Sequence, residues 1–265
     1  MNIFRHEWRS ISRSTLIWTL SMSAVAALFF LLFPAISAES SDYLDVLNNY
    51  PKPLRDALGI NVEMMGTVLG FYSFAFSFIL LCAAIQAANL GFGILSKESR
   101  EKTADFLLTK PVSRGQIVTA KLSAAVAALV VTNVVYMAIS GFLAWQVKDA
   151  PFKWSTFLLI SLSALMLQLL FLSLGLFVSV LVRKIRSVPS VSLGVVLGFY
   201  IVGMLGSVIG DKAVRYITPF KYFDTTYVIG HNAYETPYVI LAAVLIILFT
   251  AAAYVIYRKK DIHAV

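Results

Sequence analysis

Charged side chains divide the chain into six long apolar stretches. Taking Asp, Glu, Lys and Arg as boundaries leaves uncharged runs at residues 14–38, 64–96, 122–147, 154–182, 187–210 and 236–257. A bilayer core about 30 Å thick needs about 20 helical residues at about 1.5 Å rise each, and every run exceeds that length. A charge at the centre of a membrane helix costs about 2.5–3.5 kcal/mol, so membrane spans favour such runs. The pattern predicts an all-α membrane protein with six transmembrane helices in a single domain, residues 1–265.

The predicted spans lie at about 15–36, 64–92, 117–146, 154–182, 188–209 and 237–257. Before the first span, Phe4, Trp8 and Ile11 share one helical face beside a row of arginines, which predicts an interfacial helix over residues 1–13. The alternative is a frayed basic terminus. The apolar run over residues 16–33 exceeds the about 7–15 residues of a cleavable signal, so we interpret it as a permanent first span.

Three connecting segments carry local signals. In the first outer loop, start and stop residues predict two short helices, one from Ser41-Asp42 to Leu47 and one over residues 53–58. Near the inner end of the second run, Gly91 and Gly93 predict a loosened or broken helix. Between the fifth and sixth spans, the aromatic segment 211–235 is interpreted as either a substrate lid or an ordinary interfacial belt.

The lysines and arginines orient the predicted spans. With the N-terminus inside, the inner segments carry fifteen Lys and Arg residues and the outer segments carry seven. An excess of positive charge marks the cytoplasmic loops of membrane proteins. We therefore expect both termini to be cytoplasmic.

Composition narrows the class of protein further. Hydrophobic residues make up 59% of the chain and charged residues 14%, against about 45–50% and about 25% in a soluble domain. This composition argues against both a soluble globule and a disordered chain. The net charge of +8 follows the predicted topology, so we expect membrane lipid and no nucleic acid as a partner. Cys82 is the only cysteine, which excludes an internal disulfide.

Motifs for chemistry are missing from the sequence. There is no Gly-x-x-x-x-Gly-Lys-Ser/Thr loop for phosphate, no Gly-x-Ser-x-Gly elbow and no His-Glu-x-x-His pair. His6, His231 and His263 are far apart, so we expect no metal site, and we predict no catalytic residue. Ion-coupled carriers usually bury an ionisable group in the membrane. The charge-free runs therefore argue against an autonomous secondary transporter.

Two sets of residues inside the spans have open roles. Gln86, Asn89, Asn133 and Gln168 can line a substrate path, but hydrogen bonding between helices is the more ordinary role for such residues. The second set consists of three small-xxx-small pairs, which predict close helix packing within the chain or across a dimer. These pairs are Gly66/Gly70, Gly194/Gly198 and Gly206/Gly210.

The inner loop between the second and third spans predicts a docking helix. Helix formers run over residues 98–108, and Pro111 prevents the helix from continuing. Ala104, Leu107 and Leu108 share a small apolar face beside charges of both signs, which suits a groove in a cytoplasmic protein. The alternative is a solvated helix lying on the membrane surface.

This loop resembles the signature of the type-2 ABC transporter permeases. That family has an acidic and basic run followed by Thr-x-Asp/Glu-Phe-Leu-Leu-x-x-Pro-Val/Ile-Ser-Arg, and then a Lys where the third span starts. The matching positions are Thr103, Asp105, Phe106, Leu107, Leu108, Pro111, Val112, Ser113, Arg114 and Lys121. Lys102 stands where many members have Gly. The segment 218–224 and the tail 258–261 also resemble recurrent family segments.

The resemblance implies a membrane subunit that pairs with a second permease chain, the same or a sister, and with two cytoplasmic ABC ATPase subunits. ATP and Mg would be bound by the ATPase, and this chain would hold no cofactor. A coupling helix between spans 2 and 3 would dock on the ATPase, and the segment between spans 5 and 6 would re-enter the membrane from outside. The implied docking residues are Glu98, Arg100, Glu101, Thr103, Asp105, Phe106, Leu107 and Leu108.

The resulting hypothesis is the permease half of an ATP-driven exporter in a bacterial cytoplasmic membrane. Its cargo would be a hydrophobic or amphipathic compound such as a drug, an antibiotic or a peptide. Two alternatives remain: a non-transporting scaffold or sensor regulated by the ATPase, and an embedded enzyme acting on lipid. The enzyme would depend on Asp224, His231 and Glu235, which we interpret as loop residues.

Overall fold

The computed structural model describes residues 3–38, 46–101, 113–148, 151–182, 185–210 and 212–259. Six helices in this part of the chain are long and apolar enough to cross a membrane, which confirms that prediction. They are α1 (Ile3–Ala38), α4 (Val68–Glu101), α6 (Arg114–Val147), α7 (Trp154–Leu181), α8 (Val188–Ile209) and α11 (Thr236–Lys259). The shorter elements are α3 (Lys52–Leu58), η1 (Val62–Met64), α9 (Lys212–Ile217), η2 (Pro219–Lys221) and α10 (Thr225–His231).

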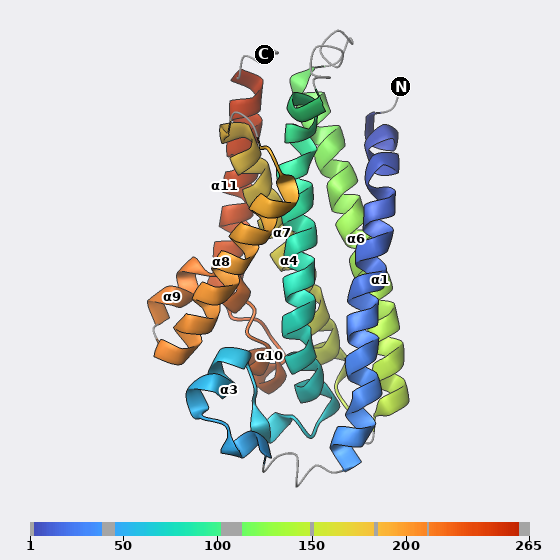
Figure 1. The fold of residues 1–265 in the computed structure, drawn as a ribbon, viewed down its shortest axis with the longest axis vertical. Coiled ribbons are helices and arrows are strands. Elements are labelled where there is room, and N and C mark those ends of the chain that lie inside the picture. The colour runs from blue at the N-terminus through green and yellow to red at the C-terminus, as the bar shows by residue number, and fades with distance from the viewer. Residues whose placement is uncertain are drawn as a thin grey trace.

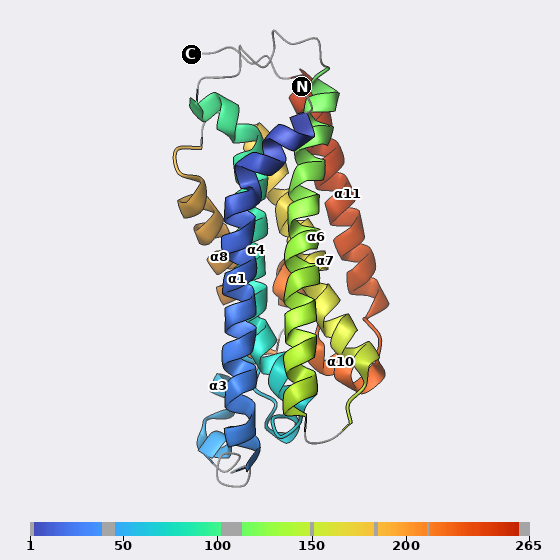
Figure 2. The ribbon, with the colours of Figure 1, turned by 90° about the vertical axis from the view of Figure 1, so that its right-hand side faces the viewer.

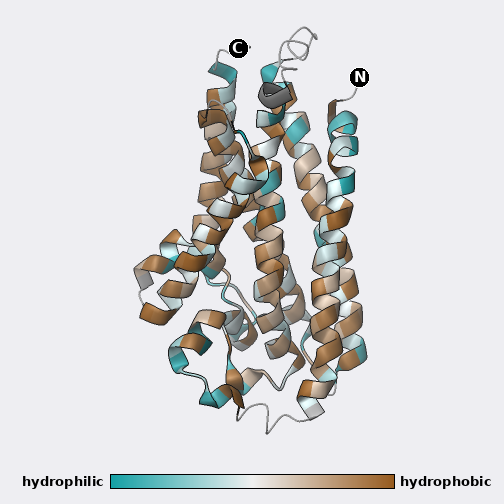
Figure 3. Cartoon of the chain, viewed as in Figure 1, coloured by the Kyte–Doolittle hydropathy of each residue, from teal (hydrophilic) through white to brown (hydrophobic). Residues whose placement is uncertain are grey.

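The helices form an elongated bundle with two distinct ends. The start of α1 and the end of α11 lie at the same end, called here the terminal end, while α3 and α10 lie at the opposite end, called the loop end (Figures 1 and 2). Apolar residues dominate the middle of the long helices, and hydrophilic residues gather towards the ends and on α3 (Figure 3). This distribution suits a bundle whose middle faces hydrocarbon and whose ends face water.

The first helix is longer than the predicted span. Residues 3–13 join α1 and do not form a separate helix. Neither Gly nor Pro occurs between Ile3 and Phe33, so nothing in the sequence ends the helix there. The first turns of α1 are nevertheless inclined to the rest of the helix (Figure 2). That these turns lie along a membrane surface stays a prediction.

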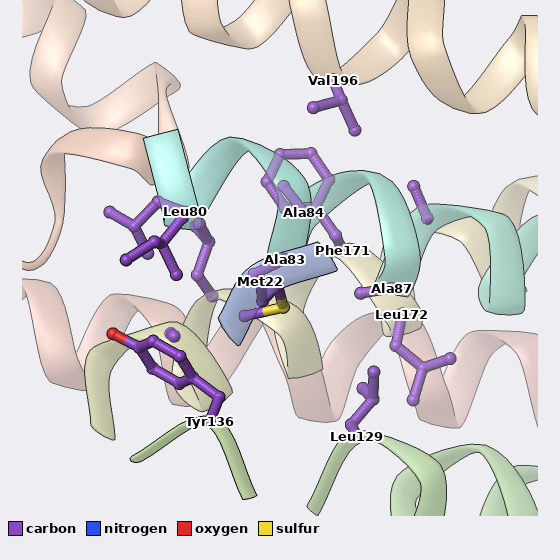
Figure 4. Packing of buried hydrophobic residues seen from close by; sticks show 14 of the residues in the cluster. Met22, Leu80, Ala83, Ala84, Ala87, Leu129, Tyr136, Phe171, Leu172 and Val196 are labelled. Atoms are coloured by element: carbon purple, nitrogen blue, oxygen red, sulfur yellow. The ribbon is translucent and has the colours of Figure 1, made fainter. Parts of the chain in front are cut away.

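The centre of the bundle is α4, which packs against α1, α6, α7 and α8. Its alanines at positions 83, 84 and 87 are fully buried, and larger side chains from the neighbouring helices fill the space around them (Figure 4). These neighbours include Met22, Leu129, Phe171, Leu172 and Val196. Small residues on one helix allow its neighbours to approach closely, and close packing is a main source of helix association in lipid.

The helix α4 is not broken at Gly91 and Gly93, because it remains helical to Glu101; a loosening of the helix by these glycines stays a prediction. Its last turns are inclined to the rest of the helix (Figure 2). Gly91 is instead a contact with α7: a Cβ at this position would lie 2.5 Å from the Leu172 carbonyl O and 3.0 Å from the Gly175 Cα. The glycine therefore removes a side chain where two helix backbones meet.

Short helices shape the loop end. The predicted helix over residues 53–58 is present as α3, which ends at Gly59 with φ +70° in the left-handed region. Residues 46–49 are also helical, whereas Ser41-Asp42 lie outside the described residues. After α8, α9 packs back against it, and a Cβ on Gly206 would lie 2.5 Å from Val214 Cγ1. The absence of a side chain at Gly206 allows this close approach.

Candidate functional site

The predicted docking segment connects α4 with α6 at the terminal end. Glu98, Arg100 and Glu101 belong to the last turns of α4. The other predicted docking residues lie outside the described residues, and these are Thr103, Asp105, Phe106, Leu107 and Leu108. The docking role of the segment therefore stays a prediction, but one of its two anchoring helices, α4, is the centre of the bundle.

A buried ion pair joins three helices at the terminal end. Lys121 Nζ lies 3.1 Å from Glu7 Oε1 and donates a hydrogen bond to the Ile94 carbonyl O at 2.8 Å. The side chains of Lys121 and Glu7 are only 1% and 7% exposed. Close by in sequence, Lys97 Nζ donates to Ser10 Oγ at 2.7 Å. We call these five residues the terminal clamp, because they tie α1 to both helices that hold the docking segment.

The sequence pattern did not predict this clamp. Lys121 is one of the fifteen positive residues of the inner segments and falls near the start of the third predicted span, and in the structure it lies inside α6 with 0% exposure. Glu7 was expected on an interfacial helix. One signal was present: Lys121 lies among Ile117, Val118 and Leu122, and a charge within an apolar helical stretch needs a partner. That this partner is Glu7, which is far away in the sequence, could be seen only in the folded chain.

The start of α6 is fixed directly after the docking segment. Ser113 Oγ accepts a hydrogen bond from the Gln116 backbone N at 3.2 Å, and Gln116 Oε1 accepts one from the Ser113 backbone N at 2.9 Å. This reciprocal capping box satisfies two backbone donors of the helix terminus. Arg114 Nη1 donates to the Arg258 carbonyl O on α11 at 3.4 Å. The Ser-Arg pair of the loop signature thus begins one helix and contacts another.

Three of the four predicted path residues come together in the middle of the bundle. Gln168 Nε2 donates to Gln86 Oε1 at 2.9 Å, Gln86 Nε2 donates to Thr132 Oγ1 at 2.9 Å, and Asn133 Nδ2 donates to Gln168 Oε1. These four side chains are at most 2% exposed. Asn89 lies outside the network, and its Oδ1 has no hydrogen-bond partner among the described residues. The geometry favours hydrogen bonding between helices over a substrate lining for the three connected residues.

The predicted glycine pairs have different surroundings. A Cβ on Gly70 would lie 2.0 Å from the Met64 carbonyl O, so Gly70 allows η1 to pack against α4. Gly210 ends α8 with φ +72°. At Gly66, Gly194 and Gly198, in contrast, a Cβ would meet no heavy atom of the described chain within 4 Å. Packing within the chain therefore accounts for Gly70 and Gly206 but not for the pair Gly194/Gly198.

A polar cavity lies at the loop end. Its volume is about 910 Å³, and its walls come from the 48–63 region, the first turns of α4, the end of α8, η2 and the start of α10. Phe76 and Leu80 of α4 and Phe220 and Phe223 of the outer segment form apolar parts of the wall. Six charged residues complete it, three of each sign: Lys52, Arg55, Asp56, Glu63, Lys221 and Asp224.

Lys221 is a half-buried cation of this loop-end cavity. Burial lowers the pKa of its ammonium below the ordinary value, and Arg215 acts in the same direction, while Asp224 and Asp56 oppose the shift. Asp224 caps α10 by accepting a hydrogen bond from the Tyr227 backbone N at 3.0 Å. Lys221 also lines a second, smaller cavity of about 200 Å³ beside α8 and α9. Lys221 thus contributes to the walls of both cavities.

The outer segment is fastened to the bundle by polar anchors. Arg215 forms a forked ion pair with Glu235, donates from Nε to the Lys221 carbonyl O at 2.8 Å, and lies over the ring of Tyr238 at 3.9 Å. Thr218 is fully buried and donates to the Phe199 carbonyl O of α8 at 2.8 Å. These contacts explain the segment 218–224 as a structural element that positions one wall of the cavity.

The rival enzyme interpretation finds no support in these contacts. Asp224 is a helix cap, Glu235 pairs with Arg215, and the His231 ring stacks on Tyr227 with a centroid distance of 4.0 Å. The described part of the chain contains no group of three His, Cys, Asp or Glu side chains that could hold a metal ion.

Six membrane-length helices make this chain a multi-pass membrane protein. Its sequence matches the family described as ABC-2 family transporter protein over residues 1–262, so the chain belongs to that family. Proteins of this family are the membrane permease subunits of ABC transporters; they lack ATPase activity themselves and work with ABC ATPase subunits. No curated protein sequence matches the chain closely enough to count as a relative.

Proposed function

We propose that this permease is the membrane half of an exporter. It moves a hydrophobic or amphipathic compound, such as a drug, an antibiotic or a peptide, out of a bacterial cell. Two cytoplasmic ATPase subunits bind ATP and Mg and dock at the terminal end, which faces the cytoplasm in agreement with the excess of Lys and Arg in the predicted inner segments. A second permease chain completes the transport path.

The observation that supports this function is that the single helix α4 extends from one end of the bundle to the other. This helix extends from the loop-end cavity, which it lines with Ser73 and Ser77, to the first docking residues at Glu98–Glu101. Its 34 residues correspond to about 51 Å at about 1.5 Å rise per residue. One continuous element in the centre of the bundle therefore connects the proposed motor contact with the proposed exit.

The terminal clamp supports a mechanical role for this connection. Lys121 and Lys97 tie α6 and α4 to α1, so a displacement of the docking segment moves three helices together. Two distant sites are coupled when both change the equilibrium between two arrangements of the element that connects them. In this proposal, closure of the ATPases on ATP displaces the segment, and the clamp passes the motion into the bundle.

The docking claim is tested with Leu107→Asp combined with Leu108→Asp. Placing two charges on the proposed apolar anchors should abolish stable binding of the ATPase, because burying an unpaired carboxylate in a protein interface is unfavourable. The measurement is copurification of the ATPase with the permease, together with substrate-stimulated ATPase activity in vesicles.

A matched control places two aspartates at exposed apolar positions of the loop end, Val46→Asp and Leu54→Asp. This variant should keep the ATPase, because the added charges lie far from the docking segment. If both double variants retain the ATPase and the same ATPase rate, the docking claim is wrong. If ATP drives no flux of any hydrophobic or amphipathic compound in a complex that remains assembled, the exporter function is wrong and the scaffold alternative gains.

A further inference from the structure

The loop-end cavity has the size and wall chemistry of a small-molecule site. Its volume of about 910 Å³ lies within the range of about 300–1,000 Å³ that is typical of ligand pockets. Phe76 and Leu80 come from a transmembrane helix, whereas the charged residues come from α3, η2 and the cap of α10. A cavity with an apolar wall on the membrane side and charges on the water side suits an amphipathic compound.

The charges do not neutralise one another in pairs. Lys221 has neither a hydrogen bond nor an ion pair from its ammonium to any described residue, although it is half-buried. Arg55 donates from Nη1 to Asn48 Oδ1 at 3.1 Å, while its buried Nε has no partner within the described ranges. An enclosed cation without a partner is unfavourable, and an anionic ligand would relieve that cost.

The acidic residues of the same cavity are placed differently. Asp224 is already used as the cap of α10, and Glu63 is exposed to solvent. Asp56 is half-buried and lies close enough to act on the charge of Lys221. The cavity donors that lack partners are therefore cationic. For this reason we expect the head group of the ligand to be negatively charged.

We propose that the loop-end cavity binds an amphipathic molecule through an anionic head group, a carboxylate or a phosphate, held by Lys221 and Arg55 with its apolar tail against Leu80 and Phe220. Only the identification of this ligand as cargo that leaves the membrane rests on the proposed export function. Binding itself requires neither ATP nor the ATPase.

The test compares probes with the same twelve-carbon tail and different head groups. N-lauroylglycine carries a carboxylate, dodecyl phosphate a phosphate and dodecyltrimethylammonium a cation. Calorimetric titration of the full chain in dodecyl maltoside should give saturable binding of at least one anionic probe and weaker binding of the cation. The carboxylate probe represents an acylated cargo and the phosphate probe a lipid, so their ratio identifies the source of the head group.

Lys221→Met should weaken binding of the anionic probe about tenfold or more, because a hydrogen bond to a charged group is lost. Arg55→Gln should weaken it as well, which keeps the test decisive if Lys221→Met folds poorly. Lys153→Met is the matched control: this exposed lysine precedes α7 and does not line the cavity, so binding should stay unchanged. Every variant is compared in the same detergent, so that partitioning of the probe into micelles cancels.

The inference is overturned if the wild type binds no anionic probe, if the cationic probe binds more tightly, or if the folded Lys221 and Arg55 variants bind as the wild type does. A failure of the export function has a different signature. In that case probe binding at the cavity persists, while ATP drives no flux in the assembled complex with its ATPase.

Discussion

The centre of the bundle and the side formed by α8 and α11 differ in how much of each helix is covered by protein. In the most apolar stretches of α4 and α7, 56% and 61% of the residues are buried, whereas the values for α8 and α11 are 17% and 11%. Figure 1 shows α8 and α11 on the side of the bundle opposite α1 and α6. All these helices have similar apolar sequences, so hydrophobicity alone does not show which helices form the core. In lipid, apolar surface is equally satisfied by protein or by acyl chains.

Glycine makes the same distinction at the level of single residues. Gly91 and Gly175 lie where α4 and α7 meet, and a Cβ on Gly175 would lie 2.9 Å from the Phe92 backbone N. Gly194 and Gly198 lie on an exposed face of α8, where an added Cβ would have no described atom within 4 Å. The first pair closes the core, and the second leaves a smooth surface for lipid or for a second permease chain. Of three substitutions with decreasing expected effects on stability, the first concerns the terminal clamp and the other two test this contrast.

The largest effect is expected in the terminal clamp. Lys121→Met leaves Glu7 buried without its partner, and breaking a buried ion pair on one side costs about 3–5 kcal/mol in the free energy of unfolding. Unfolding in mixed micelles, followed by circular dichroism, measures this loss. Adding Glu7→Leu should recover most of it, because no unpaired charge remains. A loss below about 1 kcal/mol for the single variant would show that the pair is not buried in the native membrane protein.

An intermediate effect is expected at the contact between α4 and α7. Gly175→Val places a branched side chain against the Gly91 and Phe92 backbone, and overpacking of this kind costs about 1–3 kcal/mol. The same unfolding measurement applies, with Gly198→Val on α8 as the matched substitution. Equal stability of the two valine variants would contradict the assignment of Gly175 to the packed core.

The smallest effect on the folded chain is expected on α8. Gly198→Val should change the free energy of unfolding by less than about 0.5 kcal/mol, because no described atom opposes the new side chain. If this face forms the proposed contact with a second chain, the same variant should weaken dimers seen by light scattering of the purified permease. Unchanged dimers would assign this face of α8 to lipid.

Much of the fold follows from local sequence, as particular elements illustrate. The six apolar helices, the short helix α3 and its stop at Gly59 all depend on neighbouring residues, and each was predicted. A break at Gly91 was not found, because α4 stays helical there; the close contact of Gly91 with α7 depends on the position of α7 and could not be predicted from the glycine alone. The separate helix over residues 1–13 was not found, because residues without a helix breaker continue into the first span.

The candidate site was less predictable than the fold. The sequence identified Gln86, Asn133 and Gln168 as polar groups in apolar spans, but their mutual hydrogen bonds depend on the side-by-side arrangement of α4, α6 and α7. The loop-end cavity combines residues from position 48 to position 226, and no local pattern brings these together.

The sequence by itself determined that this chain is a membrane protein of six apolar helices, because the length and charge content of each stretch decide whether it can enter lipid. The tertiary structure decided which helix is central, which charge pairs with Glu7, which glycines touch a neighbour and where a cavity remains. These outcomes depend on contacts between residues that are far apart in the chain. Such contacts leave almost no trace in local sequence, because one apolar helix can pack against another in many ways.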